Sequence, residues 1–170
     1  MFFIRKATQK DASDIANVHF YSWQDAYRDL LPASYINKEN QLTKKIALWE
    51  QILPQSTVDV WVAHDEGNKI IGFIGYYSHN NFYEITTLYV LSDYQGQGVG
   101  TNLIKRSLET LSKFNTNASF YLWVLRNNSL AIRFYRKNGF EYSGESREEQ
   151  YEDTKIIDIK MIKNTNTLVE

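Results

Sequence analysis

A glycine-rich stretch carries the clearest chemical signal in the sequence. Residues 88–101 have the pattern of a strand that runs into a turn with Gly96, Gly98 and Gly100 and then opens a helix. The first turn of a helix has N–H groups without internal partners, and the helix dipole adds partial positive charge there. Glycines lack the Cβ atoms that would keep a ligand away from the backbone. The pattern therefore predicts an anion site that suits a phosphate and needs no lysine.

Three other interpretations of this stretch can be compared with its residues. A P-loop requires a Gly-Lys-Ser/Thr ending, and Val99-Gly100-Thr101 lacks the lysine. A dinucleotide-binding fingerprint of the form G-x-G-x-x-G would place the third glycine one residue later and would belong to an N-terminal βαβ unit. A glycine-rich turn that binds no ligand is the remaining alternative.

The elements that position this loop follow from hydrophobic periodicity. The first strand is predicted at residues 2–6, and three amphipathic helical stretches follow, around residues 11–19, 23–31 and 40–52. Period-two alternation then predicts an antiparallel meander with strands near 58–63, 69–77 and 82–91 and turns at 65–68 and 80–81. A helix after Gly100, a buried strand at 119–125, a helix at 129–137 that ends at Asn138-Gly139, and strands near 141–149 and 155–163 complete the chain. The predicted order is β-α-α-α-β-β-β-α-β-α-β-β, an α+β fold.

Composition limits the kinds of partner. The chain has 170 residues with 43% hydrophobic and 23% charged side chains, which predicts one globular domain over residues 1–163 and a polar C-terminal tail at 164–170. A net charge of −1 without a basic tract argues against nucleic acid as a partner. The absence of cysteine excludes disulfides and thiolate chemistry, and the three histidines lack metal-ligand spacing, so no metal site is expected. No signal segment or long apolar run is present, which predicts a cytoplasmic protein without a membrane partner.

Two motifs together resemble the GNAT superfamily of acyl-CoA N-acyltransferases. Gln95-Gly96-Gln97-Gly98-Val99-Gly100 is similar to that family's Q/R-x-x-G-x-G/A loop, and residues 128–140 match its N-x-x-A-x-x-x-Y signature followed by Gly-Phe. The resemblance implies a central, mostly antiparallel sheet of six to seven strands, splayed at the cofactor site and flanked by four to five helices. It implies transfer of an acetyl group from acetyl-CoA to a primary amine by direct attack in a ternary complex, and a possible homodimer. The acceptor could be a small amine, a polyamine or a peptide N-terminus.

The resemblance also implies which residues contact acetyl-CoA. The pantetheine arm would lie along the strand end at residues 88–90, where the Val90 N–H would polarise the thioester carbonyl, and the amides of residues 97–101 would face the pyrophosphate. Asn128 would contact the cofactor, cap the helix that begins at Ser129, or do both. The implied cofactor-binding residues are Leu88, Tyr89, Val90, Gln95, Gly96, Gln97, Gly98, Val99, Gly100, Thr101, Asn128 and Tyr135.

Two residues are predicted to move protons. Tyr135 matches the family's general acid, which protonates the departing CoA thiolate; its alternative is a core tyrosine. Glu84, eleven residues before Gln95, matches a glutamate that some members use to deprotonate the incoming amine, and it would also contact that substrate; its alternative is a solvated strand residue.

Tyr27 is predicted to line the acceptor pocket, because residues 19–32 resemble those of bacterial members that include polyamine acetyltransferases. Trp23 is expected to pack against the sheet.

Two further functional classes remain open at this point. A non-catalytic acyl-CoA-binding or sensor domain on the same fold would bind CoA without turning over any amine. A scaffold domain without a ligand would not bind CoA at all.

Overall fold

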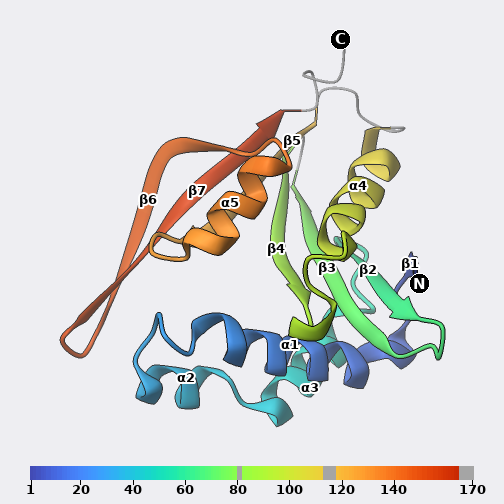
Figure 1. The fold of residues 1–170 in the computed structure, drawn as a ribbon, viewed down its shortest axis with the longest axis horizontal. Helices are drawn as coiled ribbons and strands as arrows, with labels where there is room; N and C mark the ends of the chain where they lie inside the picture. The colour runs from blue at the N-terminus through green and yellow to red at the C-terminus, as the bar shows by residue number, and fades with distance from the viewer. Residues whose placement is uncertain (80–81, 113–117, 165–170) are drawn as a thin grey trace.

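The computed structural model describes residues 1–79, 82–112 and 118–164. The predicted turn at Asn80-Asn81 and residues 165–170 of the predicted tail 164–170 lie outside the described residues, while Asn164 is the last residue of β7. Seven strands form one sheet, and five α-helices and two short 3₁₀ helices accompany them (Figure 1). In chain order the elements are β1 Phe2–Lys6, η1 Gln9–Asp11, α1 Ala12–Tyr27, α2 Ala33–Glu39, α3 Leu42–Ile52, β2 Val58–Asp65, β3 Ile70–His79, β4 Phe82–Val90, η2 Ser92–Tyr94, α4 Val99–Ser112, β5 Ser119–Leu125, α5 Ser129–Lys137, β6 Glu141–Tyr151 and β7 Thr154–Asn164.

The sheet has the strand order β1-β2-β3-β4-β5-β7-β6. All neighbouring strands are antiparallel except β4 and β5, which run parallel. The predicted α+β fold, with a mostly antiparallel sheet of six to seven strands and four to five helices, is therefore confirmed.

The two faces of the sheet carry separate hydrophobic clusters. Helices α4 and α5 cover one face, where Leu103 and Ile104 pack with Phe120 and Met161. Helices α1 and α3 cover the other face, where Ile15 and Trp49 pack against Phe73. Figure 1 shows α1, α2 and α3 gathered at one end of the molecule, and the β6–β7 hairpin extending away from the rest of the sheet. Leu91, at the start of the loop between β4 and α4, packs against the cluster to which α1 contributes.

The N-terminal helices differ from the sequence prediction. The stretches predicted around residues 11–19 and 23–31 form one helix, α1, as far as Tyr27. Ile15, His19, Trp23 and Tyr27 follow one another at intervals of four, which is the spacing of a single continuous helical face. The seven-residue helix α2 after Pro32 was not predicted, because it is too short to show periodicity and buries only Ile36.

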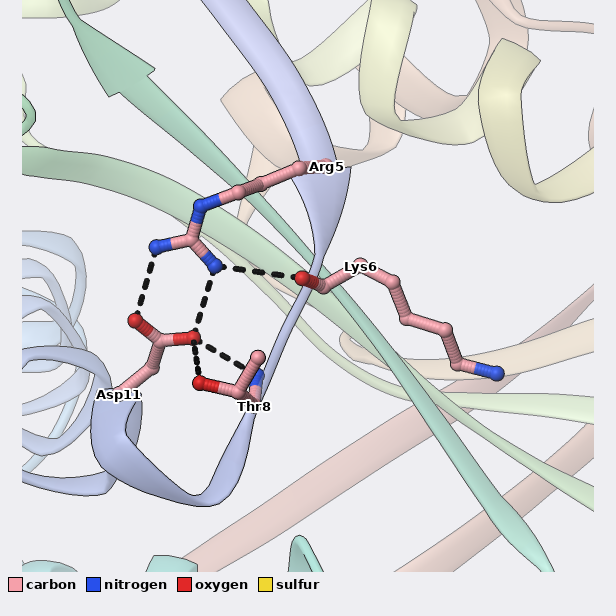
Figure 2. A network of polar contacts seen from close by, with 4 residues as sticks. All are labelled: Arg5, Lys6, Thr8 and Asp11. Carbon is pink, nitrogen blue, oxygen red and sulfur yellow. Dashed lines mark hydrogen bonds and ion pairs between the residues drawn. The ribbon is translucent and has the colours of Figure 1, made fainter.

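A network of polar contacts fixes the entry to α1 (Figure 2). Arg5 donates two hydrogen bonds of 2.8 Å to the two carboxylate oxygens of Asp11, and the backbone N–H and hydroxyl of Thr8 donate to Oδ2 of the same carboxylate. Asp11 directly precedes α1, but its side chain makes no capping hydrogen bond to that helix and joins β1 to the turn before it. Ser13 lies inside α1.

Turn chemistry explains the hairpin of β2 and β3 and the end of α5. Asp65 Oδ1 accepts from the N–H groups of Gly67 and Lys69, and Asn68 adopts a φ of 65°, so the predicted turn at residues 65–68 is confirmed. Gly139, two residues after the end of α5, has a φ of 83°, as expected for a residue that ends a helix. None of the helices in the described part of the chain combines the length and the apolar character needed to cross a membrane.

Candidate functional site

Strands β4 and β5 separate after three residue pairs. Phe82, Tyr83 and Glu84 pair with Ser119, Phe120 and Tyr121, and the two strands share no further register. Residues 85–90 of β4 remain paired with β3 on their other side, and β5 continues along β7. The predicted splay between these two strands is therefore confirmed.

The end of β4 directs main-chain groups into this splay. The Leu91 N–H donates to the Ile71 carbonyl of β3 at 2.9 Å. Because successive residues of a strand point their polar groups to opposite sides, those of Leu88 and Val90 point away from β3, towards the splay. The Val90 carbonyl there accepts a 3.0 Å hydrogen bond from the side-chain amide of Gln95. Gln95 thus ties the loop to the strand end, and its contact with a cofactor stays a prediction.

The glycine-rich loop presents a row of backbone amides. Gly96 and Gly98 have φ values of 72° and 83°, which L-residues rarely adopt. Within the described residues, the N–H groups from Gly96 to Thr101 have no protein acceptor; the nearest backbone donors with partners are Gln95, bonded to the Ser92 carbonyl, and Asn102, bonded to the Gly98 carbonyl. Six consecutive amides, at the positive end of the α4 dipole, are therefore available to an anion.

The third glycine of the motif has a different role. A Cβ atom on Gly100 would lie 3.0 Å from the Cζ atom of Phe134 on α5, whereas one on Gly96 would meet nothing within 4 Å. Gly100 is therefore required for the packing of α4 against α5. The sequence alone suggested that all three glycines make room for a ligand.

Helix α5 begins and ends as the second motif requires. The Asn128 side chain accepts from the Ala131 N–H at 3.1 Å, so its capping role is confirmed, while its contact with a cofactor stays a prediction. The ring of Tyr135 lies 5.3 Å from that of Phe134 and 5.8 Å from that of Phe140. These rings hold Tyr135 between α5 and the sheet.

Three tyrosines from different elements meet beside the splay. Tyr27 of α1, Tyr89 of β4 and Tyr135 of α5 lie close enough to affect one another's ionisation. Burial is the main cause that raises the pKa of each phenol above its ordinary value, and the neighbouring Tyr27 raises the pKa of Tyr89 and of Tyr135 further. All three phenols are therefore protonated at neutral pH. The structure brings the predicted residues Tyr27 and Tyr135 together and adds the side chain of Tyr89, which the sequence suggested only for a place on the strand.

Glu84 lies where β4 and β5 begin to separate, and it has a defined partner. The hydroxyl of Tyr121 donates to Glu84 Oε2 at 3.0 Å, across the parallel pair. Burial and the adjacent carboxylate raise the pKa of Tyr121. Glu84 is thus an oriented strand residue. Tyr121 was not predicted, because it lies 37 residues away in sequence and only the sheet register makes it a neighbour.

The face that carries Glu84 is rich in aromatic side chains and paired charges. Lys160 of β7 lies 4.9 Å from the ring of Tyr121, and Arg147 of β6 lies 4.5 Å from the ring of Trp123. A pocket of about 300 Å³ opens beside Tyr121, and its described lining is His79, Phe82, Ser119, Phe120, Tyr121, Lys160, Ile162 and Asn164. On the α1 side, the ring of Trp23 contacts that of Tyr27 at 4.7 Å. Trp23 therefore packs on the candidate pocket residue Tyr27.

Known proteins are similar to this chain in sequence. Residues 18–140 match the acetyltransferase (GNAT) family. An uncharacterized N-acetyltransferase, YuaI, of Bacillus subtilis (strain 168) is 31% identical over 141 residues, which cover 80% of this chain and 78% of the relative. A spermidine N(1)-acetyltransferase of Thermoplasma acidophilum is 28% identical over 141 residues, which cover 81% of this chain and 87% of the relative.

A solved structure agrees with the fold. The crystal structure of PaiA N-acetyltransferase from Thermoplasma acidophilum, in complex with coenzyme A, superposes with a TM-score of 0.75 at 23% identity, covering 96% of this chain and 99% of that one. The family match, the splayed strands and the open amides after β4 agree with one another. The chain belongs to the GNAT family of N-acetyltransferases.

Proposed function

We propose that this chain binds acetyl-CoA in the splay and passes its acetyl group directly to a primary amine in a ternary complex. The observation that carries the proposal is the row of unpaired amides from Gly96 to Thr101 at the start of α4. A diphosphate has the charge and the acceptor oxygens to satisfy several of these donors at once. The pantetheine arm would then extend along β4 into the gap beside β5, where its amides would pair with the main chain of Leu88 and Val90.

The thioester carbonyl would lie near the N–H of Val90. Because Val90 points its polar groups away from β3, its amide is directed at the splay and could polarise that carbonyl. As the amine attacks, negative charge develops on the carbonyl oxygen, and a fixed N–H dipole stabilises it without reorganisation. The chain has no cysteine for an acyl-enzyme, which fits direct attack.

Tyr135 would protonate the departing thiolate. Burial keeps this phenol protonated, and the same low-dielectric surroundings raise the basicity of a thiolate that forms beside it. The proton then passes from the phenol oxygen to sulfur as the C–S bond breaks. Asn128 supports this role indirectly, because it caps the helix that carries Tyr135.

Glu84 would accept the proton of the incoming amine, directly or through water. An alkylammonium ion cannot attack a carbonyl, so a base must remove one proton first. The hydrogen bond from Tyr121 orients the carboxylate at the point where β4 and β5 begin to separate. The pocket beside Tyr121 supports approach of the acceptor from this face, with Tyr27 and Trp23 bordering the α1 side.

Polyamines are the first acceptors to test, because a spermidine acetyltransferase is among the relatives. Titration calorimetry with coenzyme A tests the amide row, and thiol release from acetyl-CoA across polyamines, monoamines and peptides tests transfer. Glu84→Gln should lower kcat/KM for the preferred amine about 100-fold near neutral pH, with partial recovery at higher pH where the free amine is abundant.

The matched control for Glu84→Gln is Glu141→Gln, on the exposed part of β6, which should leave turnover unchanged. Two outcomes with coenzyme A separate the alternative functions. Binding of coenzyme A without turnover of any amine would favour an acyl-CoA sensor, and no heat with coenzyme A would contradict the proposal altogether.

A further inference from the structure

A buried lysine lies behind the tyrosine cluster. Lys45 of α3 is 7% exposed, and its ammonium position is 3.3 Å from Nε2 of His19, which is also 7% exposed. Trp49, one helical turn after Lys45, is 2% exposed and donates its indole N–H to Nδ1 of His19 at 3.1 Å. Lysines are seldom buried without a carboxylate partner. Among the described residues, no carboxylate oxygen lies within 4.0 Å of Lys45 Nζ.

The geometry of Lys45, His19 and Trp49, the buried trio, restricts which of their nitrogen atoms carry protons. An indole nitrogen can only donate, so Nδ1 of His19 must be the acceptor and carry no proton. A neutral imidazole with Nδ1 unprotonated has its single proton on Nε2, which then points at Lys45. An ammonium group has three donors and no acceptor, so it cannot receive that proton. Both contacts, Trp49 with Nδ1 of His19 and Nε2 of His19 with Lys45, are hydrogen bonds only if Lys45 is a neutral amine.

Burial favours the neutral amine of Lys45, whereas its surrounding groups favour the cation. Burial lowers the pKa of Lys45 to about 8, although Glu39 of α2 acts in the opposite direction. The ring of Trp23 lies 5.3 Å from Lys45 Nζ and would also favour a cation. Burial is the main cause that lowers the pKa of His19 to about 3, and Lys45 adds to this only while it is protonated, so the imidazole is neutral throughout the working range.

The trio supports the candidate site through a stacked pair. The ring of His19 stacks on that of Tyr89, with centroids 4.9 Å apart and planes inclined by 26°. Tyr89 in turn adjoins Tyr27 and Tyr135 beside the splay. The orientation of the His19 ring therefore determines the surface against which Tyr89 rests.

We propose that Lys45 is a positioning residue: as a neutral amine it accepts the Nε2–H of His19 and so fixes the ring on which Tyr89 stacks. Protonation of Lys45 converts its nitrogen into a donor and requires the other imidazole tautomer. The buried N–H of Trp49 then loses its acceptor, which destabilises this arrangement. The arrangement is complete above the pKa of Lys45 and is lost as the pH falls through it.

Three substitutions separate this role from that of an ordinary buried cation. Lys45→Gln retains an acceptor for Nε2–H and does not titrate, Lys45→Met has a similar length without an acceptor, and Lys45→Arg is a permanent donor. The expected order of thermal stability is Gln above Met above Arg. A charged Lys45 held by Trp23 and Glu39 would give the opposite order, with Arg the best tolerated, and that result would overturn the proposal.

The effect of Lys45 on turnover is measured as kcat against pH with the same acceptor amine throughout, and this test rests on the proposed function. The ratio of kcat of the wild-type protein to kcat of Lys45→Gln should rise about tenfold between about pH 7 and pH 9, as Lys45 loses its proton. The titration of the acceptor amine cancels in this ratio. A ratio that does not change with pH would contradict a titrating Lys45.

A readout independent of turnover is the tautomer of His19 in the wild-type protein. Nitrogen NMR of ¹⁵N-histidine-labelled protein distinguishes the two tautomers, and the His19→Gln spectrum identifies the His19 signals among those of the three histidines. A proton on Nε2 above about pH 9 is expected, with loss of this state as the pH is lowered. A proton on Nδ1 at every pH would overturn the proposal even if the enzyme is active, whereas the expected tautomer in an inactive protein would contradict only the proposed function.

Discussion

Gly100 of α4 lies so close to Phe134 of α5 that a Cβ atom at residue 100 would be 3.0 Å from the ring. This contact sets the distance between the helix that starts at the amide row and the helix that carries Tyr135. The glycine-rich loop and the motif that contains the proposed general acid Tyr135 are therefore joined by direct packing. A change at Gly100 should act on the position of α5 and not only on ligand binding.

Substitution of Gly100 tests this packing. Gly100→Ala gains about 1 kcal/mol of helix propensity but crowds Phe134, which costs about 1–3 kcal/mol, so we expect a net loss of unfolding free energy. In a Phe134→Leu background the crowding is relieved, and the same substitution should stabilise the protein. Urea unfolding of the four proteins measures both effects, and an equal effect in both backgrounds would argue against the contact.

The positive φ of Gly98 should matter for CoA binding. Gly98→Ala places an L-residue at a φ of 83°, which costs about 1–2 kcal/mol, and relaxation of this strain moves the adjacent amides. We expect the Kd for coenzyme A, measured by calorimetry, to rise about tenfold or more. Gly144→Ala on β6 is a matched control, because Gly144 has a φ of 90° and lies outside the loop. It should lose a similar amount of stability while the Kd stays the same.

Removal of the Tyr135 hydroxyl should affect the chemical step. Tyr135→Phe is expected to lower kcat about 100-fold while the KM for acetyl-CoA changes little, because the ring and its packing remain. The pKa of Tyr135 is raised by burial, so the phenol should not lose its proton below pH 10. The kcat of the wild-type protein should therefore show no alkaline decline up to that pH. Tyr142→Phe, at an exposed tyrosine of β6, is the control, and a loss of the same size there would show that the effect is not local.

The contact between Arg5 and Asp11 should support stability at neutral pH. Hydrogen bonds from Arg5 lower the pKa of Asp11 from 3.8 to about 2, which corresponds to about 2 kcal/mol of unfolding free energy. Because the folded-state pKa is depressed, this contribution is present above about pH 4 and is lost as the pH falls towards about 2. Asp11→Asn should therefore destabilise the protein at pH 7 and have little effect near pH 2.

A second carboxylate paired with arginine provides the comparison for Asp11. Asp25 contacts Arg28 at 2.7 Å, but both side chains are largely exposed. Asp25→Asn should change the unfolding free energy by less than about 1 kcal/mol. Equal effects at the two positions would show that burial and the additional Thr8 donors do not strengthen the Asp11 contact.

Local signals in the sequence were sufficient for the turn between β2 and β3, the amide-rich loop and helix α5. The turn at residues 65–68 depends on Asp65 and Asn68 alone, and α5 is bounded by its cap Asn128 and by Gly139. The positive φ values at Gly96 and Gly98 are likewise a property of glycine in a tight turn. Each of these features is determined by residues within a few positions of one another.

Features that depend on distant pairing could not be predicted. The contact of Tyr121 with Glu84 requires the register of two parallel strands, and that of His19 with Lys45 requires the packing of α1 on α3. Gly100 appeared to be a ligand-facing residue because Phe134 is far away in sequence.

Two differences concern helix length and do not depend on distant pairing. The predicted length of α1 was wrong although Ile15, His19, Trp23 and Tyr27 follow one helical face, and α2 was too short to be recognised.

Among the described residues, three pairs join β4 to β5, so the sheet consists of two halves with a narrow seam between them. One half carries the amide row and the other carries the β6–β7 hairpin, while α5 rests against α4 across the seam. A ligand bound between β4 and β5 would form the hydrogen bonds that these two strands do not make with each other. Occupancy of the site would then fasten the two halves to each other, so that affinity for the ligand and rigidity of the whole sheet rise together.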